Sequence, residues 1–260
     1  MRAVRRTQKM YVNGKWVRSE SGRVVESGEV WACNASRKDA RDAVSAAVSA
    51  KDSWGSTRAI LRGMILYRLG ESLAVRSEIE GFEACAKRSV WWAGWSEKLQ
   101  MIAGSVNPVS GYLCASSIEP SGVSVALIDG ATASEVSWRI IDAIGAALCG
   151  GNTMCVAVPC RWADVAQTIS EVVAVSDIPA GVVGILTTDD AECVKTFAGH
   201  GEVTNLQGAM CESFSVTASE LLELGDEHLQ RFSAQTYAED SPSLALWMCE
   251  HKTVWHPVHI

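Results

Sequence analysis

The chain has no long hydrophobic run. No apolar stretch among its 260 residues approaches the roughly 18–20 residues needed to cross a bilayer. Residues 1–9 carry basic side chains without an acidic one, and they have no apolar core of the kind that a secretory signal requires. We therefore expect no membrane span and a cytoplasmic protein. The mitochondrial matrix is the alternative, since a short organelle presequence could have this composition.

The nine cysteines form no recognisable metal or redox motif. There is no C-x-x-C pair and no Cys/His cluster with zinc spacing. Several lie within apolar stretches, as Cys149 and Cys155 do, and the count is odd. This pattern favours buried, reduced thiols in a reducing compartment and no metal site.

Three of the five histidines, His251, His256 and His259, lie close together near the C-terminus, with Cys249 nearby. A fortuitous metal site is the less favoured interpretation of this group. A terminal segment that packs through Trp255 is the favoured one.

The charge balance limits the kinds of partner. Lys and Arg number 23 against 30 Asp and Glu, a net charge of −7, which argues against a nucleic-acid-binding surface over the whole chain. With 48% hydrophobic and 20% charged residues, the chain can bury a full core and is not disordered.

The N-terminal part predicts a hairpin followed by helices. Asn13-Gly14, inside the strand-like stretch Tyr11–Val17, suits the positive φ angles of a type I′ turn. Ser36–Asp39 resembles a capping box, and helices are expected over 57–80 and 82–103. The expected apolar residues of the first of these helices are Ile60, Met64, Tyr67, Leu69 and Leu73.

The expected helix over 82–103 is rich in tryptophan. Trp91, Trp95 and Leu99 recur every four residues on one face, with Trp92 beside them. We interpret these tryptophans as core or interface packing; an aromatic ligand cage is the alternative.

From residue 123 onward, strands and helices alternate. Strands are expected over 123–128, 153–158 and 182–187, with a short fourth one over 203–206. The intervening helical patterns and the spacing of about 30 residues are typical of parallel strands joined by right-handed crossovers. The sequence thus predicts an α/β protein with a doubly wound, mostly parallel Rossmann-like sheet and an N-terminal helical layer.

A sheet of this kind binds ligands beyond the carboxyl ends of its strands. Neither G-x-G-x-x-G nor a Walker A motif is present. The loop that begins at Asp129 could seat an anion at a helix N-terminus, but Asp129 and Glu135 flank it unfavourably. Arg161, after the second strand, is either a phosphate contact or a solvated arginine.

Seven segments in order resemble the aldehyde dehydrogenase superfamily, and they are spread over nearly the whole chain. They are Tyr11–Val17, Trp92–Lys98, Asn107–Gly111, Glu119–Val123, Ala147–Thr153, Ser176–Val183 and Lys252–Pro257. The chain most resembles the truncated, non-catalytic second domain of the two-domain family-sixteen type. This resemblance implies a cofactor-binding-type domain over 1–213 with an arm hairpin at about 110–118. It also implies a shortened C-terminal helix and an oligomerisation strand over 214–260, and an absent catalytic domain.

The chain departs from the family at the positions that carry chemistry. None of its cysteines follows Gly-Gln, as the family's nucleophile does. The family's oxyanion asparagine loop corresponds to residues 128–131, its ribose-binding loop to 158–161 and its pyrophosphate loop to 208–213. In this chain all three lack the family's key side chains. We regard the matching positions as vestigial: Ala131, Val158, Arg161, Gly208 and Ser213. No cofactor is therefore expected, with NAD(P) as the alternative.

Two further features come from the same resemblance. Leu222–Gly225 is similar to the stretch that holds the family's general base, but it also fits an amphipathic helix over 217–232 in which Leu221, Leu224 and Leu229 pack and Glu223 faces water. The expected oligomerisation residues are Tyr112, Cys114, Leu246, Trp247, Val254 and Trp255.

These observations lead to one functional hypothesis and one alternative. The hypothesis is that the chain is not an enzyme but a structural subunit, which pairs with a catalytic aldehyde dehydrogenase, with itself or with a larger assembly. The alternative is an NAD(P)-binding oxidoreductase module with altered contacts, in which Arg161 meets a phosphate. Under both the hypothesis and the alternative, we expect no nucleic-acid partner.

Overall fold

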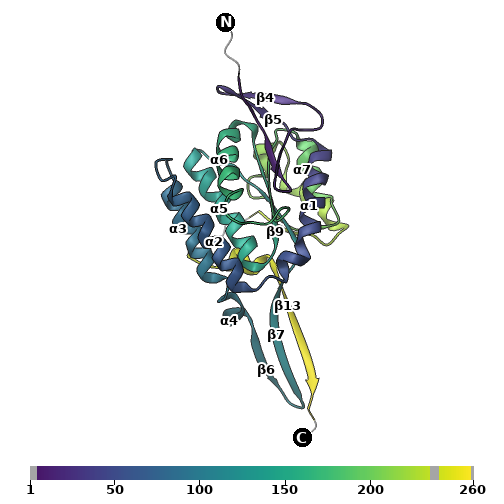
Figure 1. Cartoon of the computed structure of the whole chain (residues 1–260). Coiled ribbons are helices and arrows are strands. Elements are labelled where there is room, and N and C mark those ends of the chain that lie inside the picture. The colour runs from purple at the N-terminus through teal and green to yellow at the C-terminus, as the bar shows by residue number, and fades with distance from the viewer. Residues whose placement is uncertain (1–4, 235–239, 259–260) are drawn as a thin grey trace.

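The computed structural model describes residues 5–234 and 240–258, which form an α/β body and a projecting β arm (Figure 1). The body is built on a seven-stranded sheet with the order β12-β11-β8-β9-β10-β2-β3. Its strands are β2 (Met10–Val12), β3 (Lys15–Val17), β8 (Val123–Leu127), β9 (Thr153–Val158), β10 (Val183–Thr187), β11 (Val203–Gln207) and β12 (Arg231–Ser233).

Five neighbouring strands, β12 to β10, run parallel, and β2 and β3 add an antiparallel hairpin at one edge. Asn13 and Gly14 have φ angles of 52° and 70°, so the expected type I′ turn is confirmed. The three buried strands and their rhythm are also confirmed, as is the predicted fold class.

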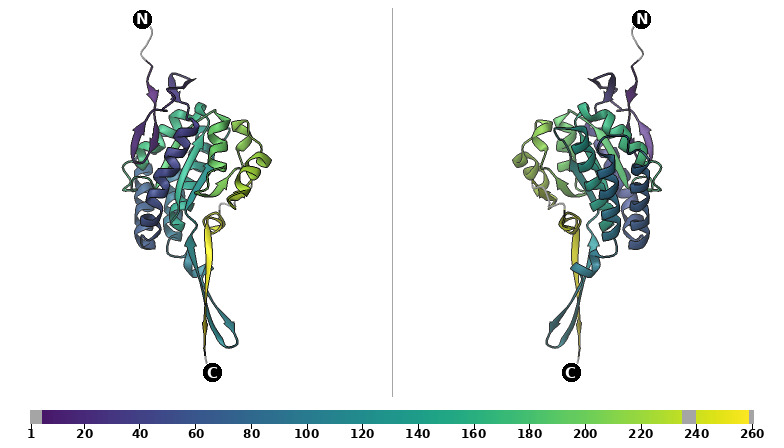
Figure 2. Two further views of the ribbon diagram at one scale, coloured as in Figure 1. Left: turned by 90° about the vertical axis from the view of Figure 1, so that its right-hand side faces the viewer. Right: turned by 90° about the vertical axis from the view of Figure 1, so that its left-hand side faces the viewer.

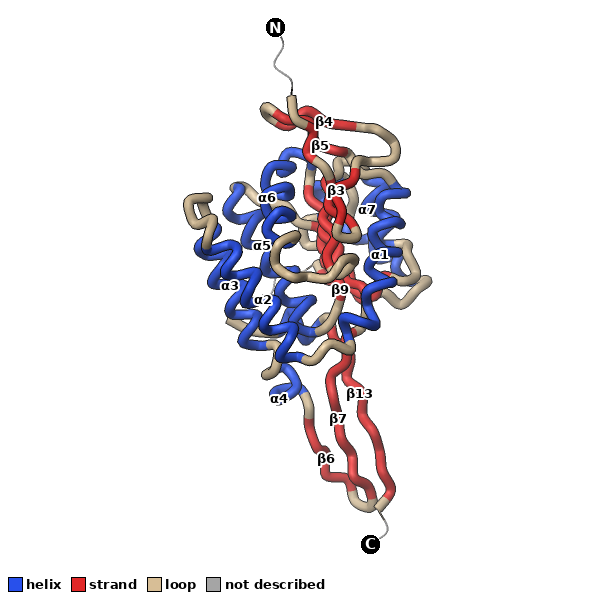
Figure 3. The backbone as a smooth tube through the Cα atoms, viewed as in Figure 1, coloured by secondary structure: helices blue, strands red, loops and turns tan. Residues whose placement is uncertain are grey.

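Helices cover both faces of this sheet (Figure 3). One layer contains α5 (Ala133–Gly150) and α6 (Ala163–Val173), with α2 (Ala59–Ala74) and α3 (Phe82–Trp95) packed outside them. The other face carries α1 (Arg37–Gly55), α7 (Ala191–Ala198) and α8 (Ala218–Asp226). None of the helices in the described part of the chain combines the length and the apolar character needed to span a bilayer.

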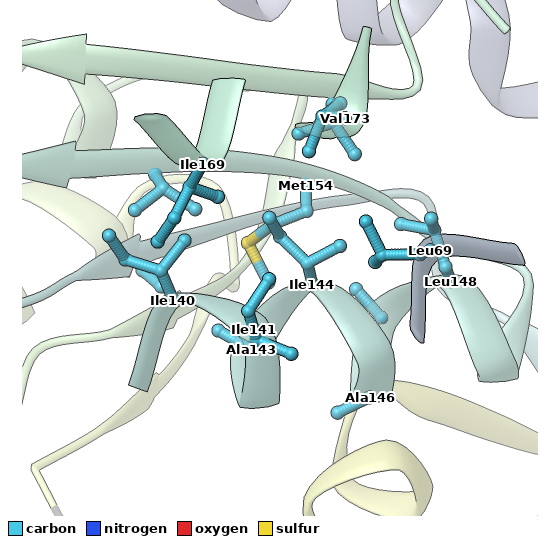
Figure 4. Close-up of a cluster of buried hydrophobic side chains, with 14 of the residues drawn as sticks. Leu69, Ile140, Ile141, Ala143, Ile144, Ala146, Leu148, Met154, Ile169 and Val173 are labelled. Carbon is cyan, nitrogen blue, oxygen red and sulfur yellow. The ribbon is translucent and has the colours of Figure 1, made fainter. Parts of the chain in front are cut away.

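Side chains alternate between the two faces of the sheet along each strand, so the core has two parts, one on each face. In β9, Met154, Val156 and Val158 face the α5 side, whereas Cys155 and Ala157 face the α1 side. On the α5 side the strand meets a continuous row of buried aliphatic side chains (Figure 4). Burial on both faces explains why these strands read as unbroken apolar runs.

Local signals fix the ends of the main helices. Ser36 and Asp39 form the predicted capping box at the start of α1. Thr132 caps α5, and Gly151, at a φ of 90°, ends it. Within α5, a Cβ on Gly145 would overlap the ring of Trp92, so glycine there allows α3 and α5 to pack closely.

The arm is a three-stranded antiparallel sheet that projects from the body (Figure 2). Its order is β13-β7-β6, with β6 (Ser105–Val109), β7 (Tyr112–Pro120) and β13 (Cys249–Pro257). Two short helices, α4 (Leu99–Ala103) and α9 (Ser243–Trp247), lead into β6 and β13. The turn between β6 and β7 lies at the start of the hairpin that was expected at about 110–118.

Several expectations need correction. A small sheet of β1 (Thr7–Gln8), β5 (Val30–Cys33) and β4 (Val24–Ser27) was not predicted. The expected helix over 82–103 is interrupted between α3 and α4, and the one over 217–232 ends with α8, before β12. Two short 3-10 helices, Cys160–Trp162 and Cys211–Phe214, follow β9 and β11.

The packing faces of two helices were predicted only in part, since Leu69, Leu73 and Leu221 are buried as expected but the other expected residues are exposed. In α2, Ile60, Met64 and Tyr67 are exposed, and the buried side is formed by Leu66, Leu69, Gly70 and Leu73. In α8, Leu221 is buried, but Leu224 is exposed and Leu229, beyond the helix, is 91% exposed.

Candidate functional site

The strand order places the candidate site at the carboxyl ends of β8 and β11. The chain moves outward from β8 to β9 and β10 on one side and then returns to place β11 on the other. The loops after these neighbouring strands therefore diverge above the sheet, which is where open α/β sheets bind ligands. The loops that begin at Ile128, Pro159 and Gly208 follow β8, β9 and β11 at this edge of the sheet.

A polar cluster lies at this end of the sheet, and we call the region around it the crevice. Asp129 is buried, accepts a hydrogen bond from Nε1 of Trp162 at 2.6 Å, and forms an ion pair with Arg161. Burial raises the pKa of Asp129, but hydrogen bonds from Ser213, Trp162 and the Gly130 backbone, together with the Arg161 charge, outweigh it and leave the pKa lowered. We name Asp129, Arg161, Trp162 and Ser213 the crevice cluster.

The structure thus brings three loops together around one carboxylate. Arg161 and Ser213, both expected here, lie within the cluster, and Ala131 lies next to it in the loop after β8. Val158 is fully buried in β9 and faces the core. The central role of Asp129 was missed, because the sequence presented it only as an unfavourable neighbour for an anion. The sequence did contain a signal for this contact, because Asp129 and the Arg161-Trp162 pair follow adjacent parallel strands.

Gly208 has a structural explanation within the chain. A Cβ at this position would overlap the ring of Phe232 from β12. Its backbone N–H donates to the carbonyl of Ser233 at 2.8 Å. The glycine therefore admits an aromatic side chain of the same chain at the end of β11.

Three donors at this end of the sheet already have acceptors in the protein. The Ala131 N–H donates to Oε2 of Glu135 at 2.8 Å, and the Cys160 N–H donates to Oδ1 of Asp189 at 2.9 Å. The Arg161 guanidinium is paired with Asp129. A dinucleotide phosphate at this place would have to displace these acceptors and would meet the repulsion of their carboxylates.

The cysteines are placed as structural residues. All nine are unpaired and buried. Burial raises the pKa of Cys149, Cys155 and Cys193 to about 12, so these thiols stay protonated at neutral pH. The expectation that the thiols are buried is confirmed.

The remaining candidates lie apart from the crevice. Glu223 is on the exposed side of α8. His251 and His256 are on β13, and His259 lies outside the described residues. No group of three or more potential metal ligands was found among the residues that the structure describes.

The expected oligomerisation residues divide into two groups. Tyr112, Val254 and Trp255 lie on the arm and are 46%, 52% and 56% exposed, and the Tyr112 and Trp255 rings meet edge to face at 5.8 Å. Cys114 is fully buried within the arm. Leu246 and Trp247 are in the short helix α9 and pack against the body.

A second arginine–aspartate pair, which sequence reasoning missed, lies between α3 and α5. Nε of Arg88 donates to Oδ1 of Asp142 at 2.6 Å, and Nε1 of Trp92 donates to the same oxygen at 2.8 Å. The guanidinium lies 4.1 Å from the ring centroid of Trp91 and 5.3 Å from that of Trp138. Two of the tryptophans expected as packing residues, Trp91 and Trp92, therefore contact an ion pair.

Comparison with known proteins identifies proteins that are similar to this chain. No family model matches the chain. The hydroxyisobutyraldehyde dehydrogenase of Mycolicibacterium austroafricanum is 30% identical over 258 residues, an alignment that covers 87% of this chain and 48% of the relative.

Solved structures share the fold at lower identity. An NAD⁺ complex of aldehyde dehydrogenase from Bacillus cereus aligns with a TM-score of 0.74 at 20% identity, covering 87% of this chain and 50% of that one. A salicylaldehyde dehydrogenase from Pseudomonas putida G7, complexed with salicylaldehyde, aligns with a TM-score of 0.76 at 18% identity, covering 88% and 51%.

These findings correct the expectation that the chain is not an enzyme. The proteins that it matches are named aldehyde dehydrogenases, so the comparisons support an enzymatic interpretation. The chain spans about half the length of the curated relative and of the solved structures. It has the fold of the aldehyde dehydrogenase superfamily and has homologues among aldehyde dehydrogenases over about half of their length.

Proposed function

We propose that this chain is a subunit of an aldehyde dehydrogenase assembly, which it joins through its β arm. The observation that carries the proposal is the exposure of large apolar side chains on both faces of the arm. Trp255 and Tyr112 project from one face, and Val106, Leu113 and Val254 from the other, each at least 46% exposed. A thin sheet with two such faces is stabilised when another surface covers it.

The division of the chain remains part of this proposal. Residues 1–213 would be the cofactor-binding-type domain, and residues 214–260 would add the C-terminal helix and the arm strand. The resemblance to the truncated second domain of the two-domain family-sixteen type supports this division. Since β12 pairs with β11, the second segment also completes the main sheet.

Sedimentation velocity tests the proposal. The purified chain is measured over a range of concentrations, alone and mixed with a full-length aldehyde dehydrogenase from the same organism. We expect a species heavier than the 27.9 kDa monomer. Val254→Lys should reduce this species, whereas Leu229→Lys, at an exposed leucine of the body, should not. A monomer under all of these conditions would overturn the proposal.

The second candidate function is an NAD(P)-binding oxidoreductase module with altered contacts. Arg161 favours it, because its side chain is 55% exposed at the crevice despite the ion pair with Asp129. Calorimetric titration with NAD and NADP tests it. Micromolar binding that Arg161→Ala abolishes would support the candidate, and an absence of binding heat at millimolar dinucleotide would exclude it.

A further inference from the structure

We propose that β13 pairs with β13 of a second copy of this chain, antiparallel and about a two-fold axis at Thr253. The two arms would then form one continuous six-stranded sheet. This inference rests on the proposed function, since it names the partner surface for the arm. It follows from the hydrogen-bonding polarity of β13 and from the charges along it.

One edge of β13 is open in the described part of the chain. The strand order is β13-β7-β6, which leaves β13 outermost, and it lies along one margin of the projecting arm (Figure 1). It is nine residues long, and its burial pattern shows only Cys249 buried. A long exposed edge presents unpaired N–H and C=O groups that can template another strand.

The contacts at the two ends of β13 show which groups point outward. The Val258 N–H donates to the Gly111 carbonyl at 2.9 Å, and the Ser121 N–H donates to the Met248 carbonyl at 3.4 Å. Both pairs continue the β13–β7 register, so even-numbered residues of β13 turn their backbone groups toward β7. Because the direction alternates along a strand, the odd-numbered residues turn theirs to the open edge.

This polarity restricts the register of a β13–β13 pair. His251, Thr253 and Trp255 must supply the hydrogen bonds from both copies, so odd residues face odd residues. When Thr253 lies opposite Thr253 of the second copy, three such pairs form. They are the central Thr253 pair and, on either side of it, a His251 that faces a Trp255. The same register sets Glu250 opposite His256, an attractive pair that occurs twice because of the symmetry.

The neighbouring registers are less favourable. A shift of two residues in one direction sets Lys252 opposite the second Lys252, which repels. A shift in the other direction sets His251 opposite Pro257, which has no N–H to donate. The Cys249 carbonyl already accepts a hydrogen bond from Arg231 at 2.7 Å, so it does not extend the edge.

An engineered disulfide tests the axis directly. In the proposed register, the two Thr253 residues form a hydrogen-bonded pair with Cα atoms about 5.5 Å apart, within the range for a disulfide. Two cysteines at position 254 would lie diagonally, about 7–8 Å apart, outside that range. The native cysteines are all buried and leave little background.

We therefore expect Thr253→Cys to form a covalent dimer on treatment with diamide, at least tenfold faster than Val254→Cys. Equal rates, or faster cross-linking at position 254, would overturn the two-fold pairing. Sedimentation of the reduced variants separates the two proposals. A heavy species without selective cross-linking rejects this inference and leaves arm-mediated assembly standing, whereas a monomer, alone and with the aldehyde dehydrogenase, rejects both.

Charge substitutions at His256 test the register independently. His256→Lys strengthens the attraction to Glu250 of the second copy, and His256→Glu replaces it with repulsion at two symmetric positions. We expect dimer dissociation constants that differ by roughly tenfold between these variants, with lysine tighter. In the register that sets His256 opposite Lys252, the order would be reversed, so a tighter glutamate variant contradicts the proposed axis.

Discussion

Two arginine–aspartate pairs have the same chemistry in different surroundings. In both, a tryptophan indole donates to the carboxylate that the arginine neutralises. Arg88 and Asp142 lie between α3 and α5, where their side chains are 8% and 14% exposed. In the crevice cluster, Asp129 is 7% exposed but Arg161 is 55% exposed.

The comparison shows how the protein uses one motif for two purposes. A sealed pair is one in which the protein encloses both side chains. Removing one partner of such a pair strongly destabilises the fold, because the other charge then lies in an apolar setting. A pair with one open partner is screened by water and contributes little to stability. The Arg88 pair therefore belongs to the framework, whereas Arg161 sits where a ligand or another chain could reach it.

The largest effect should come from the sealed pair. Asp142→Asn keeps the shape of the side chain and removes the carboxylate charge that faces the buried guanidinium of Arg88. We expect a loss of about 3–5 kcal/mol in the free energy of unfolding. Urea unfolding followed by the fluorescence of the ten tryptophans measures it.

The matched control for this substitution is on α3 itself. Glu83→Gln removes the carboxylate of an exposed ion pair with Lys87. It should leave the unfolding midpoint unchanged, because both side chains are in water. If Asp142→Asn were equally silent, the sealed pair would not be a framework element.

The next effect concerns the packing around the same tryptophan. Gly145→Ala would force Trp92 away from α5, and with it the indole that donates to Asp142. We expect a loss of about 1–3 kcal/mol in urea unfolding, as for overpacking in a core. Gly94→Ala in α3 meets nothing closer than Nζ of Lys98 at 4.0 Å. That control should raise stability slightly, since alanine is the better helix former.

The crevice cluster should show its contribution through pH. Because the pKa of Asp129 is lowered in the folded chain, its contribution to stability is present above the unfolded pKa, near 4, and is lost as pH falls through the lower folded pKa. Asp129→Asn should cost about 1–2 kcal/mol at neutral pH. It should also flatten the decline in the urea midpoint on acidification below pH 4. An unchanged acid profile would show that Asp129 is not the group that the cluster stabilises.

The fold was predictable where signals are local. The Asn13-Gly14 turn, the capping box at Ser36 and the parallel strands each follow from a short pattern with one physical meaning. The small strand pair β4 and β5 was not predictable. Its members are four residues long, and β4 mixes valines with Glu26 and Ser27.

The packing face of α2 shows a limit of periodicity. Ile60, Met64 and Tyr67 form one apolar row, and Leu66, Leu69 and Leu73 form another on the opposite side of the helix. Both have helical spacing, so the pattern cannot choose the buried one, and the expected set combined residues from both rows. In this fold, α3 and α5 cover the second row.

The candidate site was predictable in position but not in its contacts. Parallel strands bring their following loops to one edge, so Asp129 and Arg161 could be placed near each other. Arg161 could bind the Asp129 carboxylate or remain open to a phosphate. The outcome depends on how the two side chains are oriented, and they are 32 positions apart in the sequence.

The smallest effect should come from Arg161 itself. Arg161→Ala removes a guanidinium that is mostly in water, so we expect a loss below about 1 kcal/mol in urea unfolding. Asp129 would keep its hydrogen bonds from Trp162 and Ser213, which explains why removing the arginine costs less than removing the carboxylate. A loss as large as that of Asp142→Asn would mean that the two pairs are equivalent framework elements, and Arg161 would then no longer be a residue held ready at the crevice.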